Sequence, residues 1–598
     1  MGTNRAQKKK YFMADAAVTE PSPPEKGLEA PYPGSKKMPR WDTGELIDAP
    51  RFTWRNWFTM LGPGLIAGGA AIGGGEWLLG PEVTARYGGS LLWLASLSIL
   101  GQLIYNIEIS RYTLYSGEPI FTGKLRILPG PGFWLVVYLV LDFGSVFPYL
   151  AASAATPLFM TLWGRLPDPA QFPGDATWMT ALAWGVFFLA LVPLIFGGKI
   201  YNTLKAIMSF KIVVVLGFLL FLGLFYSHRS TWTDIFSGFF KFGNVPIRRG
   251  EDFNGNGMLD PGEDWDGDGH LDVVEPRFDS NHDGEITRQD AFIDRDGDGI
   301  CDGDNVDNVF VSLVQGRGLP PIDWSVIALL AAMAAIAGQG GLTNTPISNY
   351  TRDSGWGMGW HVGAIPSLVG GHSIKLSHAG CVFHVTRESL VRWKRWYRHV
   401  ARDQLVVWFP ACFLGLALPS MLSVEFLRRG TEVNDWAVAG MTATGVESRV
   451  AAISGTGLGR FCWFMTLFCG FLVLAPSMAS TADGLIRRWV DVFWTASSRL
   501  RKLDPKEIKK VYFTVLFAWS AFALVMLTVG KPKQLLIFAT IFYNFALGFS
   551  CFHSLFVNRL LLPRALRPRW FACTAMLAAG MFFTVLGLVS TLEKLGYL

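Results

Sequence analysis

The sequence predicts an all-α polytopic membrane protein of about eleven helices, ten of which form an inverted repeat of five. Hydrophobic residues make up 51% of the 598 residues and charged residues only 17%, below the quarter that is usual in soluble domains. Apolar segments of roughly 20 residues recur along the chain, each long enough to cross a bilayer. Glycines interrupt the first and the sixth segments, which is the spacing expected of two related halves.

The apolar segments divide the chain into domains. Residues 51–227 hold helices 1–5 and residues 323–558 hold helices 6–10, while 559–598 add the eleventh helix and the C-terminus. Residues 1–50 are polar and Pro-rich, so we expect a disordered tail without a cleavable signal peptide. Residues 228–322 form a polar insertion between the repeats. The expected spans are 57–85, 90–114, 132–162, 177–198, 202–226, 323–351, 404–424, 459–484, 511–529, 534–556 and 569–590.

Basic residues predict the orientation of these spans. They are concentrated in alternate loops, around 111–126, 387–402, 487–510 and 559–569. Cytoplasmic loops are enriched in Lys and Arg, so these loops and the N-terminus are expected in the cytoplasm. The protein is then a multi-pass protein of the cell (inner) membrane, with the 228–322 insertion and the C-terminus outside.

The two interrupted helices predict a binding site. The first contains "GGAAIGGGEW" at 68–77, and the sixth reads "AAMAAIAGQGGLTNTPISNY" at 331–350. Unwound backbone inside a membrane is tolerated where it is buried in protein or lines a cavity, and its carbonyls can hold an ion. Glycines also serve close helix packing, but two clusters at equivalent positions, each with polar side chains, favour a site.

The segment "GPGLIAGGAAIGGGEWLLGPEVTARYGGSLLW", 62–93, resembles the first-helix region of the Nramp family of divalent-metal transporters. The resemblance implies a LeuT-like fold of the APC superfamily and proton-linked import of metals such as manganese or iron. It also implies that Asp142 matches the family's proton-pathway aspartate and that Thr540 stands where the family has a coordinating glutamine. It does not cover 1–50 or 228–322.

This sequence departs from the family's metal motifs. The Asp-Pro-Gly-Asn motif falls on residues 73–76, so glycine replaces the ligand aspartate and Glu76 replaces the asparagine. The Met-Pro-His motif falls near 340–342, so the thioether that favours transition metals is absent. An all-oxygen site suits a hard cation such as magnesium or manganese. The expected substrate-binding residues are Gly73, Glu76, Gln339, Gly340, Thr343, Asn344, Thr540 and Asn544.

Two other functions remain open at this point. A small organic solute could be carried on the same fold, or the chain could be a calcium-binding surface receptor whose helices only anchor it. No nucleophile elbow or phosphate loop is present, so we expect no enzyme, and no nucleic-acid partner is expected. Asn349, Tyr350, Arg352 and Asp353 close the sixth span and could form a cytoplasmic gate or an ordinary charge cluster at a helix end.

Four consecutive stretches of the insertion match the twelve-residue calcium loop, in which alternate oxygen ligands surround a hard cation and a glycine permits the sharp turn. They are "DFNGNGMLDPGE", "DWDGDGHLDVVE", "DSNHDGEITRQD" and "DRDGDGICDGDN". The first two abut without a helix between them, as in extracellular repeats, and we expect bound calcium to be structural. The expected ligands are Asp252, Asn254, Asn256, Asp260, Glu263, Asp264, Asp266, Asp268, Asp272, Glu275, Asp279, Asn281, Asp283, Thr287, Asp290, Asp294, Asp296, Asp298, Asp302 and Asn305.

Overall fold

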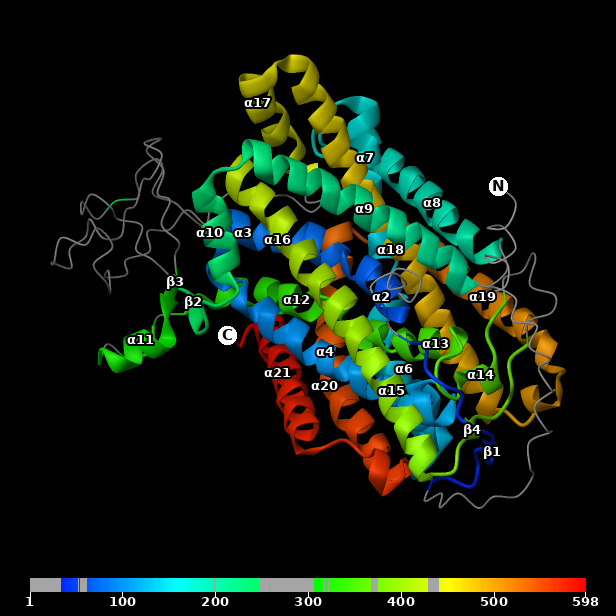
Figure 1. Ribbon diagram of the computed structural model, residues 1–598. Helices are drawn as coiled ribbons and strands as arrows, with labels where there is room; N and C mark the ends of the chain where they lie inside the picture. Colours follow the sequence, from blue (N-terminus) through cyan, green and yellow to red (C-terminus); the bar gives the residue numbers. More distant parts are fainter. Residues whose placement is uncertain are drawn as a thin grey trace, which may run out of the picture.

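Long helices dominate the fold (Figure 1). The computed structural model describes residues 34–51, 53, 62–196, 200–247, 258, 306–316, 318–320, 322–366, 375–427 and 440–597. Nine helices in this part of the chain are long and apolar enough to cross a membrane. Pro63–Leu91 and Trp93–Ser116 pass the same test together, across a bend of 97°. Wherever the eleven predicted segments are described, they coincide largely with helix, and the chain is an integral multi-pass membrane protein.

The first half of the bundle contains two interrupted segments. The first consists of α2, a π-helical turn and α3, and the third consists of α6, a 3-10 turn and α7. The third was predicted as continuous; it breaks because Phe147 and Pro148 take extended or irregular backbone angles before α7. The bounds are α2 Pro63–Ala71, η2 Gly75–Leu79, α3 Gly80–Tyr87, η3 Gly88–Leu91, α4 Trp93–Ser116, α5 Ile120–Arg126, α6 Pro131–Leu141, η4 Phe143–Val146, α7 Tyr149–Trp163, α8 Gly174–Ile195 and α9 Ile200–Tyr226.

The second half repeats the interruption in its first segment, where α12 and α13 are separated by an unwound stretch and a 3-10 turn. The bounds are η6 Trp324–Val326, α12 Ile327–Ile336, η7 Gly341–Asn344, α13 Pro346–Asp353, α14 Gly359–Val362, α15 Arg387–Asp403, η8 Gln404–Trp408, α16 Phe409–Phe426, α17 Ala443–Ser454, α18 Thr456–Ala496, η10 Leu500–Lys502, η11 Pro505–Glu507, α19 Ile508–Val529, α20 Pro532–Leu561, η12 Arg564–Leu566 and α21 Trp570–Lys594.

Helix α18 is much longer than predicted. Its 41 residues correspond to roughly 60 Å at 1.5 Å per residue, about twice the hydrocarbon thickness of a bilayer. Arg487 and Arg488, which the basic-residue pattern assigned to a cytoplasmic loop, are buried in this helix. Lys124 and Arg126 of α5 are buried as well. These four basic residues therefore belong to the protein interior, where acidic or polar partners replace water.

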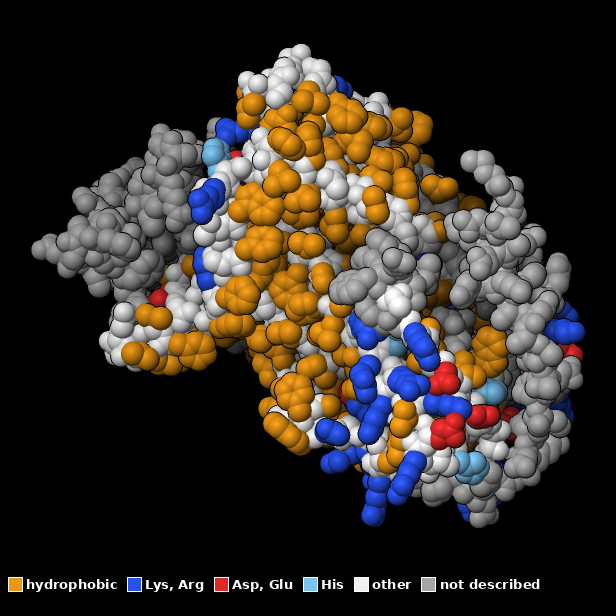
Figure 2. Space-filling view, viewed as in Figure 1, with side chains coloured by type: hydrophobic (Ala, Val, Ile, Leu, Met, Phe, Trp, Pro, Cys, Tyr) orange, Lys and Arg blue, Asp and Glu red, His pale blue; other side chains and the backbone are white. Residues whose placement is uncertain are grey.

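The outer face of the bundle is apolar where lipid is expected. Hydrophobic side chains cover the surface over α9 and α16 (Figure 2). Val213 of α9 is 72% exposed and Val406 of η8 is 54% exposed. Such large apolar exposure is typical of a surface that contacts lipid rather than water.

Residues 34–50 correct the expectation of a disordered tail over 1–50. Strand β1, Asp42–Thr43, pairs in parallel with β4, Cys381–Val382, and Met38 and Leu46 are buried in the core. The Trp41 indole donates to Glu118 Oε2 at 3.1 Å. This segment is ordered because it buries apolar side chains against α4 and α15, a contact that its polar composition did not reveal. Residues 1–33 lie outside the described part of the chain.

Glu118 holds the N-terminal segment against the bundle. Burial opposes its ionisation, but the Arg126 guanidinium and hydrogen bonds from Arg126, Trp41 and Tyr112 together hold the pKa of Glu118 below its ordinary value. The Gly380 N–H donates to the same carboxylate at 2.9 Å. Glu118 thus joins the N-terminal segment, α5 and the strand β4 through one charged group.

Only the ends of the polar insertion are described. Helix α10, Arg229–Gly238, leads into strand β2, Asn244–Pro246, which pairs antiparallel with β3, Val306–Asn308, ahead of α11, Val309–Val314. The pairing brings the two ends of the insertion together at one end of the bundle. All twenty predicted calcium ligands, from Asp252 to Asn305, lie outside the described residues.

Candidate functional site

The breaks in the first and sixth segments meet inside the bundle. Helix α2 ends at Ala71 and α12 ends at Ile336. A Cβ atom on Gly75 would lie 2.6 Å from the carbonyl oxygen of Ile336, so only glycine allows this approach. Gly338 and Gly340 have φ angles of +104° and +61°, a backbone conformation that side chains disfavour. The glycine clusters therefore create two unwound segments in contact.

Glu76 joins the two unwound segments. Its Oε2 accepts from the Gly73 N–H at 3.0 Å, and its Oε1 accepts from the Gly338 N–H at 2.8 Å. The side chain is buried. One carboxylate thus satisfies backbone donors from both breaks, and a hydrogen bond to a charged acceptor is among the stronger ones. Each oxygen keeps a lone pair that can face a ligand.

Gln102 of α4 supports the break in the sixth segment, a role that the sequence analysis did not identify. Its Nε2 donates to the Ala337 carbonyl at 2.7 Å. Its Oε1 accepts from the Gln339 N–H at 3.0 Å and from the Asn344 side chain at 2.7 Å. An amide can both donate and accept, so it replaces the hydrogen bonds that the helix lacks. A lone amide inside the apolar 90–114 segment was the available signal.

A cavity of about 40 Å³ opens between the breaks. By the volume of a buried water, it has room for about three water-sized groups. Glu76 supplies the carboxylate of its wall, and Arg488 supplies a guanidinium. The lining residues that can offer polar groups are Gly73, Gly74, Gly75, Glu76, Tyr149, Gly338, Gln339, Thr343, Tyr350, Ser477, Ser480, Thr481 and Arg488.

The predicted site residues divide into three groups. Gly73, Glu76, Gln339 and Thr343 line the cavity. Gly340 and Asn344 belong to the same break but are engaged with Gln102. On α20, the Thr540 hydroxyl donates to the Ile537 carbonyl of its own helix and the Asn544 amide donates to the Ala331 carbonyl. Neither side chain is part of the cavity wall. The hydrogen bond from Asn544 instead links α20 to α12.

Lys211 of α9 places a buried amino group beside the cavity. Its ammonium nitrogen donates to the Val473 carbonyl at 2.7 Å and to the Ser477 hydroxyl at 2.6 Å. The side chain is fully buried, and no carboxylate within 4.0 Å of it is found among the described residues. Glu76 is the acidic group that interacts with it electrostatically. A fully buried lysine inside an apolar segment is a functional candidate by default, and the sequence analysis overlooked it.

Asp142 forms a buried ion pair. Its Oδ1 accepts from Arg488 Nη2 at 2.8 Å, and its Oδ2 accepts from the Trp489 indole at 2.9 Å. Arg488 also donates to the Leu342 carbonyl of the sixth-segment break at 2.9 Å. Asp142 therefore acts on the cavity through Arg488. That Asp142 takes part in a proton path remains a prediction. To accept a proton, Asp142 would have to separate from Arg488.

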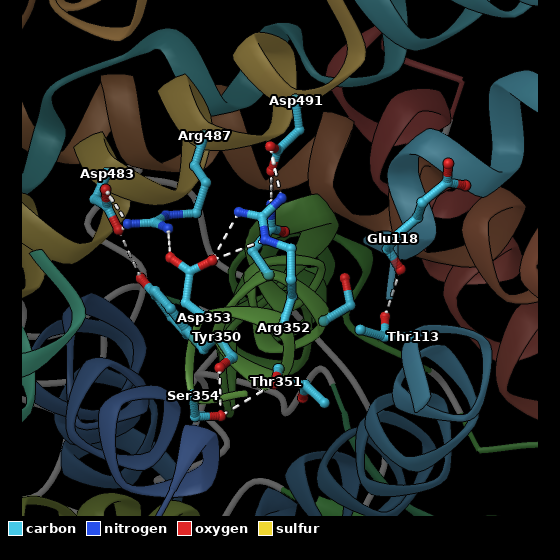
Figure 3. A network of polar contacts seen from close by, with 12 residues as sticks. Thr113, Glu118, Tyr350, Thr351, Arg352, Asp353, Ser354, Asp483, Arg487 and Asp491 are labelled. Atoms are coloured by element: carbon cyan, nitrogen blue, oxygen red, sulfur yellow. Dashed lines mark hydrogen bonds and ion pairs between the residues drawn. The ribbon is translucent and has the colours of Figure 1, made fainter. Parts of the chain in front are cut away.

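A network of buried charges ties α13 to α18 (Figure 3). Arg352 Nη1 donates to Asp491 at 2.7 Å and Arg352 Nε donates to Asp353 at 2.8 Å. Arg487 donates to Asp353 and, through two nitrogens at 3.0 Å each, to Asp483. All five side chains are buried. The charges at the end of the sixth span thus form a closed network inside the bundle.

Hydroxyl and amide groups complete this network. The Tyr350 hydroxyl donates to Asp483 at 3.2 Å and the Tyr512 hydroxyl donates to it at 2.6 Å, while the Asn349 amide donates to Asp491. Tyr350 also lines the Glu76 cavity. Tyr350 therefore connects the cavity to the network, and the network closes the bundle on the side of α13.

Comparison with known proteins supports the fold. No protein-family model matches the chain, and no curated protein matches it. Among solved structures, two variants of the Eremococcus coleocola manganese transporter align with TM-scores of 0.54 and 0.53 at 11% identity. A complex of that transporter with an aromatic bis-isothiourea-substituted compound aligns at 0.52 and 12% identity. Each alignment covers 91% of this chain and 88% of the other. At this identity the likeness establishes the fold, and the predicted LeuT-like fold is confirmed.

Proposed function

We propose that the chain is a secondary-active transporter, not an enzyme, and that it carries a hard divalent cation such as magnesium or manganese. The main support is the single carboxylate that joins two unwound helices at a cavity. Glu76, Gln339 and Thr343 line that cavity together with backbone groups, so its donors are oxygens and no thioether. Hard cations prefer such ligands.

The size of the cavity favours a small ion. Room for about three water-sized groups suits a cation with part of its hydration shell, which magnesium in particular gives up reluctantly. A zwitterion, even one as small as glycine, would need the walls to move apart.

The charges near the cavity suggest that cation binding is coupled to release of a proton. Glu76 brings one negative charge, and a protonated Lys211 would cancel it. Arg488 is already balanced by Asp142. A divalent cation beside a buried ammonium is unfavourable at low dielectric. The two hydrogen bonds that Lys211 donates, to Val473 and Ser477, match the two hydrogens of a neutral amine. Binding of the cation is therefore expected to release a proton from Lys211.

Proton release can be measured directly. Titration calorimetry of the wild type with magnesium or manganese, in buffers of different ionisation enthalpy, should report about one proton released per cation bound at a pH where Lys211 is charged. Affinity should rise with pH, because protons compete less. Lys211→Met should bind the cation without releasing a proton, and its affinity should not change with pH over that range.

Lys205→Met is the matched control, since Lys205 lies on the same helix but interacts electrostatically with Asp403 and not with Glu76. It should keep the proton release of the wild type. Unchanged proton release in Lys211→Met would exclude Lys211 as the source and would leave Glu76 and Asp142 as the candidates.

A small zwitterionic solute is the second candidate. Glu76 and the cationic Lys211 would complement the ammonium and carboxylate of an amino acid, which is the specific observation in its favour. Uptake into proteoliposomes, measured side by side for magnesium, manganese and a set of amino acids, separates the two candidates. No uptake of any of them would favour the remaining alternative, a surface receptor anchored by the helices.

We also propose that the loops within 252–305 bind calcium as a structural ion on the outer side. The four in-register matches support this. The full-length protein should bind up to four calcium ions in the millimolar range typical of extracellular modules. Limited proteolysis should cleave 252–305 faster with chelator than with millimolar calcium. A variant with Asp252, Asp264, Asp279 and Asp294 changed to Ala should be cleaved at one rate in both conditions. Equal cleavage of the wild type with and without calcium would contradict the proposal.

A further inference from the structure

A second cavity, of about 590 Å³, lies between the N-terminal segment and α15. None of its lining residues belongs to the wall of the Glu76 cavity. Four arginines and one aspartate supply its charges. The lining residues are Asp48, Ala49, Pro50, Arg51, Arg395, Arg398, His399 and Arg402.

The cavity lies beside the entry of two helices into the bundle. Helix α15 continues through η8 into the apolar helix α16. Directly after Arg402, Asp403 accepts from the Gly62 N–H at 3.0 Å and holds the start of the first segment. Lys and Arg side chains gather at this end of the molecule, next to the hydrophobic face (Figure 2). A ligand in the cavity would therefore be close to the headgroup region of a surrounding bilayer.

Two of the arginines around the cavity, Arg395 and Arg398, have donors available to bind an anion. Arg395 is 58% exposed and reaches Asp48 at only 3.4 Å. Arg398 is exposed and makes no hydrogen bond or ion pair with the described part of the chain. His399 is 5% exposed, its ring contacts Trp356 and Trp396, and its Nδ1 has no hydrogen-bond partner among the described residues. The His399 ring therefore packs against the tryptophans beneath the cavity, and the two arginines supply the free donors.

We propose that this cavity binds a phosphate group, presented by an anionic phospholipid of the adjacent leaflet. Arginine forks match the oxygens of a phosphate in pairs, and basic juxtamembrane pockets attract anionic lipids. The general enrichment of basic residues in cytoplasmic loops explains why arginines occur on this side. It does not explain why four arginines line one cavity of about 590 Å³. Free phosphate shares this chemistry and is the competing source.

Native mass spectrometry of the full-length protein in detergent tests the proposal. Phosphatidylglycerol is titrated in one arm, phosphatidylcholine in a second, and inorganic phosphate without lipid in a third. The wild type should retain phosphatidylglycerol selectively. Arg395→Gln/Arg398→Gln should weaken that binding about 30-fold, as expected for two arginines near a charged headgroup. Both side chains are exposed, so folding should be preserved.

Arg564→Gln/Arg569→Gln is the matched control. It removes the same charge from exposed positions in a loop predicted to lie on the same side of the membrane, and it should leave binding within about twofold of the wild type. Equal loss in the two double variants would overturn the site, because general surface charge would then account for binding. Saturable binding of inorganic phosphate that Arg395→Gln/Arg398→Gln abolishes would overturn the lipid assignment in favour of free phosphate. Absence of selectivity for phosphatidylglycerol in the wild type would overturn it as well.

Discussion

Replacement of Glu76 by glutamine is expected to abolish cation uptake. The variant keeps the shape of the side chain but removes the one negative charge of the cavity wall. Its amide nitrogen cannot accept a hydrogen bond, so either the Gly73 or the Gly338 N–H loses its partner. Loss of a direct charged ligand in a buried site costs about 3–5 kcal/mol, which corresponds to an affinity for magnesium or manganese lowered at least about 100-fold. Calorimetry and proteoliposome uptake measure the two effects.

Glu76→Asp is the informative companion variant. It keeps the charge but shortens the reach to the two backbone donors, so part of the cation affinity should remain. Wild-type affinity in Glu76→Gln would remove Glu76 from the site and, with it, most of the argument for a metal substrate. A zwitterionic substrate should lose less affinity than a cation in the same variant, because its carboxylate end does not depend on Glu76.

Replacement of Arg487 by methionine is expected to destabilise the protein strongly. Arg487 lies between Asp353 and Asp483, and all three side chains are buried. Methionine fills most of the volume but leaves Asp483 without its counter-charge and Asp353 with Arg352 as its remaining one. Removing one partner of a buried ion pair typically costs about 3–5 kcal/mol. Denaturant-induced unfolding of the purified protein in detergent should show this as a lower midpoint.

Two further variants test the origin of that loss. Lys510→Met removes an exposed partner of Glu507 and should cost at most about 1 kcal/mol. A double-mutant cycle of Asp353→Asn with Arg487→Met should be strongly non-additive, because the two residues share one network. Additive effects, or an Arg487→Met variant as stable as Lys510→Met, would show that the network contributes little to the fold.

The network also has a consequence for access to the cavity. Tyr350 belongs both to the cavity wall and to the network, and α13 is joined to α18 through Arg352, Asp353, Arg487 and Asp491. Opening of the bundle on the side of α13 would require these buried pairs to separate. Two-state rearrangements of this kind commonly use ion-pair networks at their interfaces.

The sequence by itself determined where the helical segments lie and where the first and the sixth of them break. Runs of apolar residues predict spans because a helix in lipid must satisfy its own backbone and cover it with apolar side chains. Glycines at 73–75 and at 338, 340 and 341 predict the breaks because they lower helix propensity locally, and the breaks are where they were predicted. Glu76 could be singled out because a charge in such a segment is costly.

Only the tertiary structure decided which polar groups meet. Gln102, Lys211 and Arg488 lie on three different helices, far from Glu76 in sequence, and nothing in local periodicity encodes that they converge on the two breaks. The basic residues Arg487 and Arg488 fit a cytoplasmic loop by pattern, yet both are buried, because Asp353, Asp483 and Asp142 from the folded bundle neutralise them. Local sequence specifies where a helix weakens; the packing of distant helices specifies which charges are paired there and which one remains for a ligand.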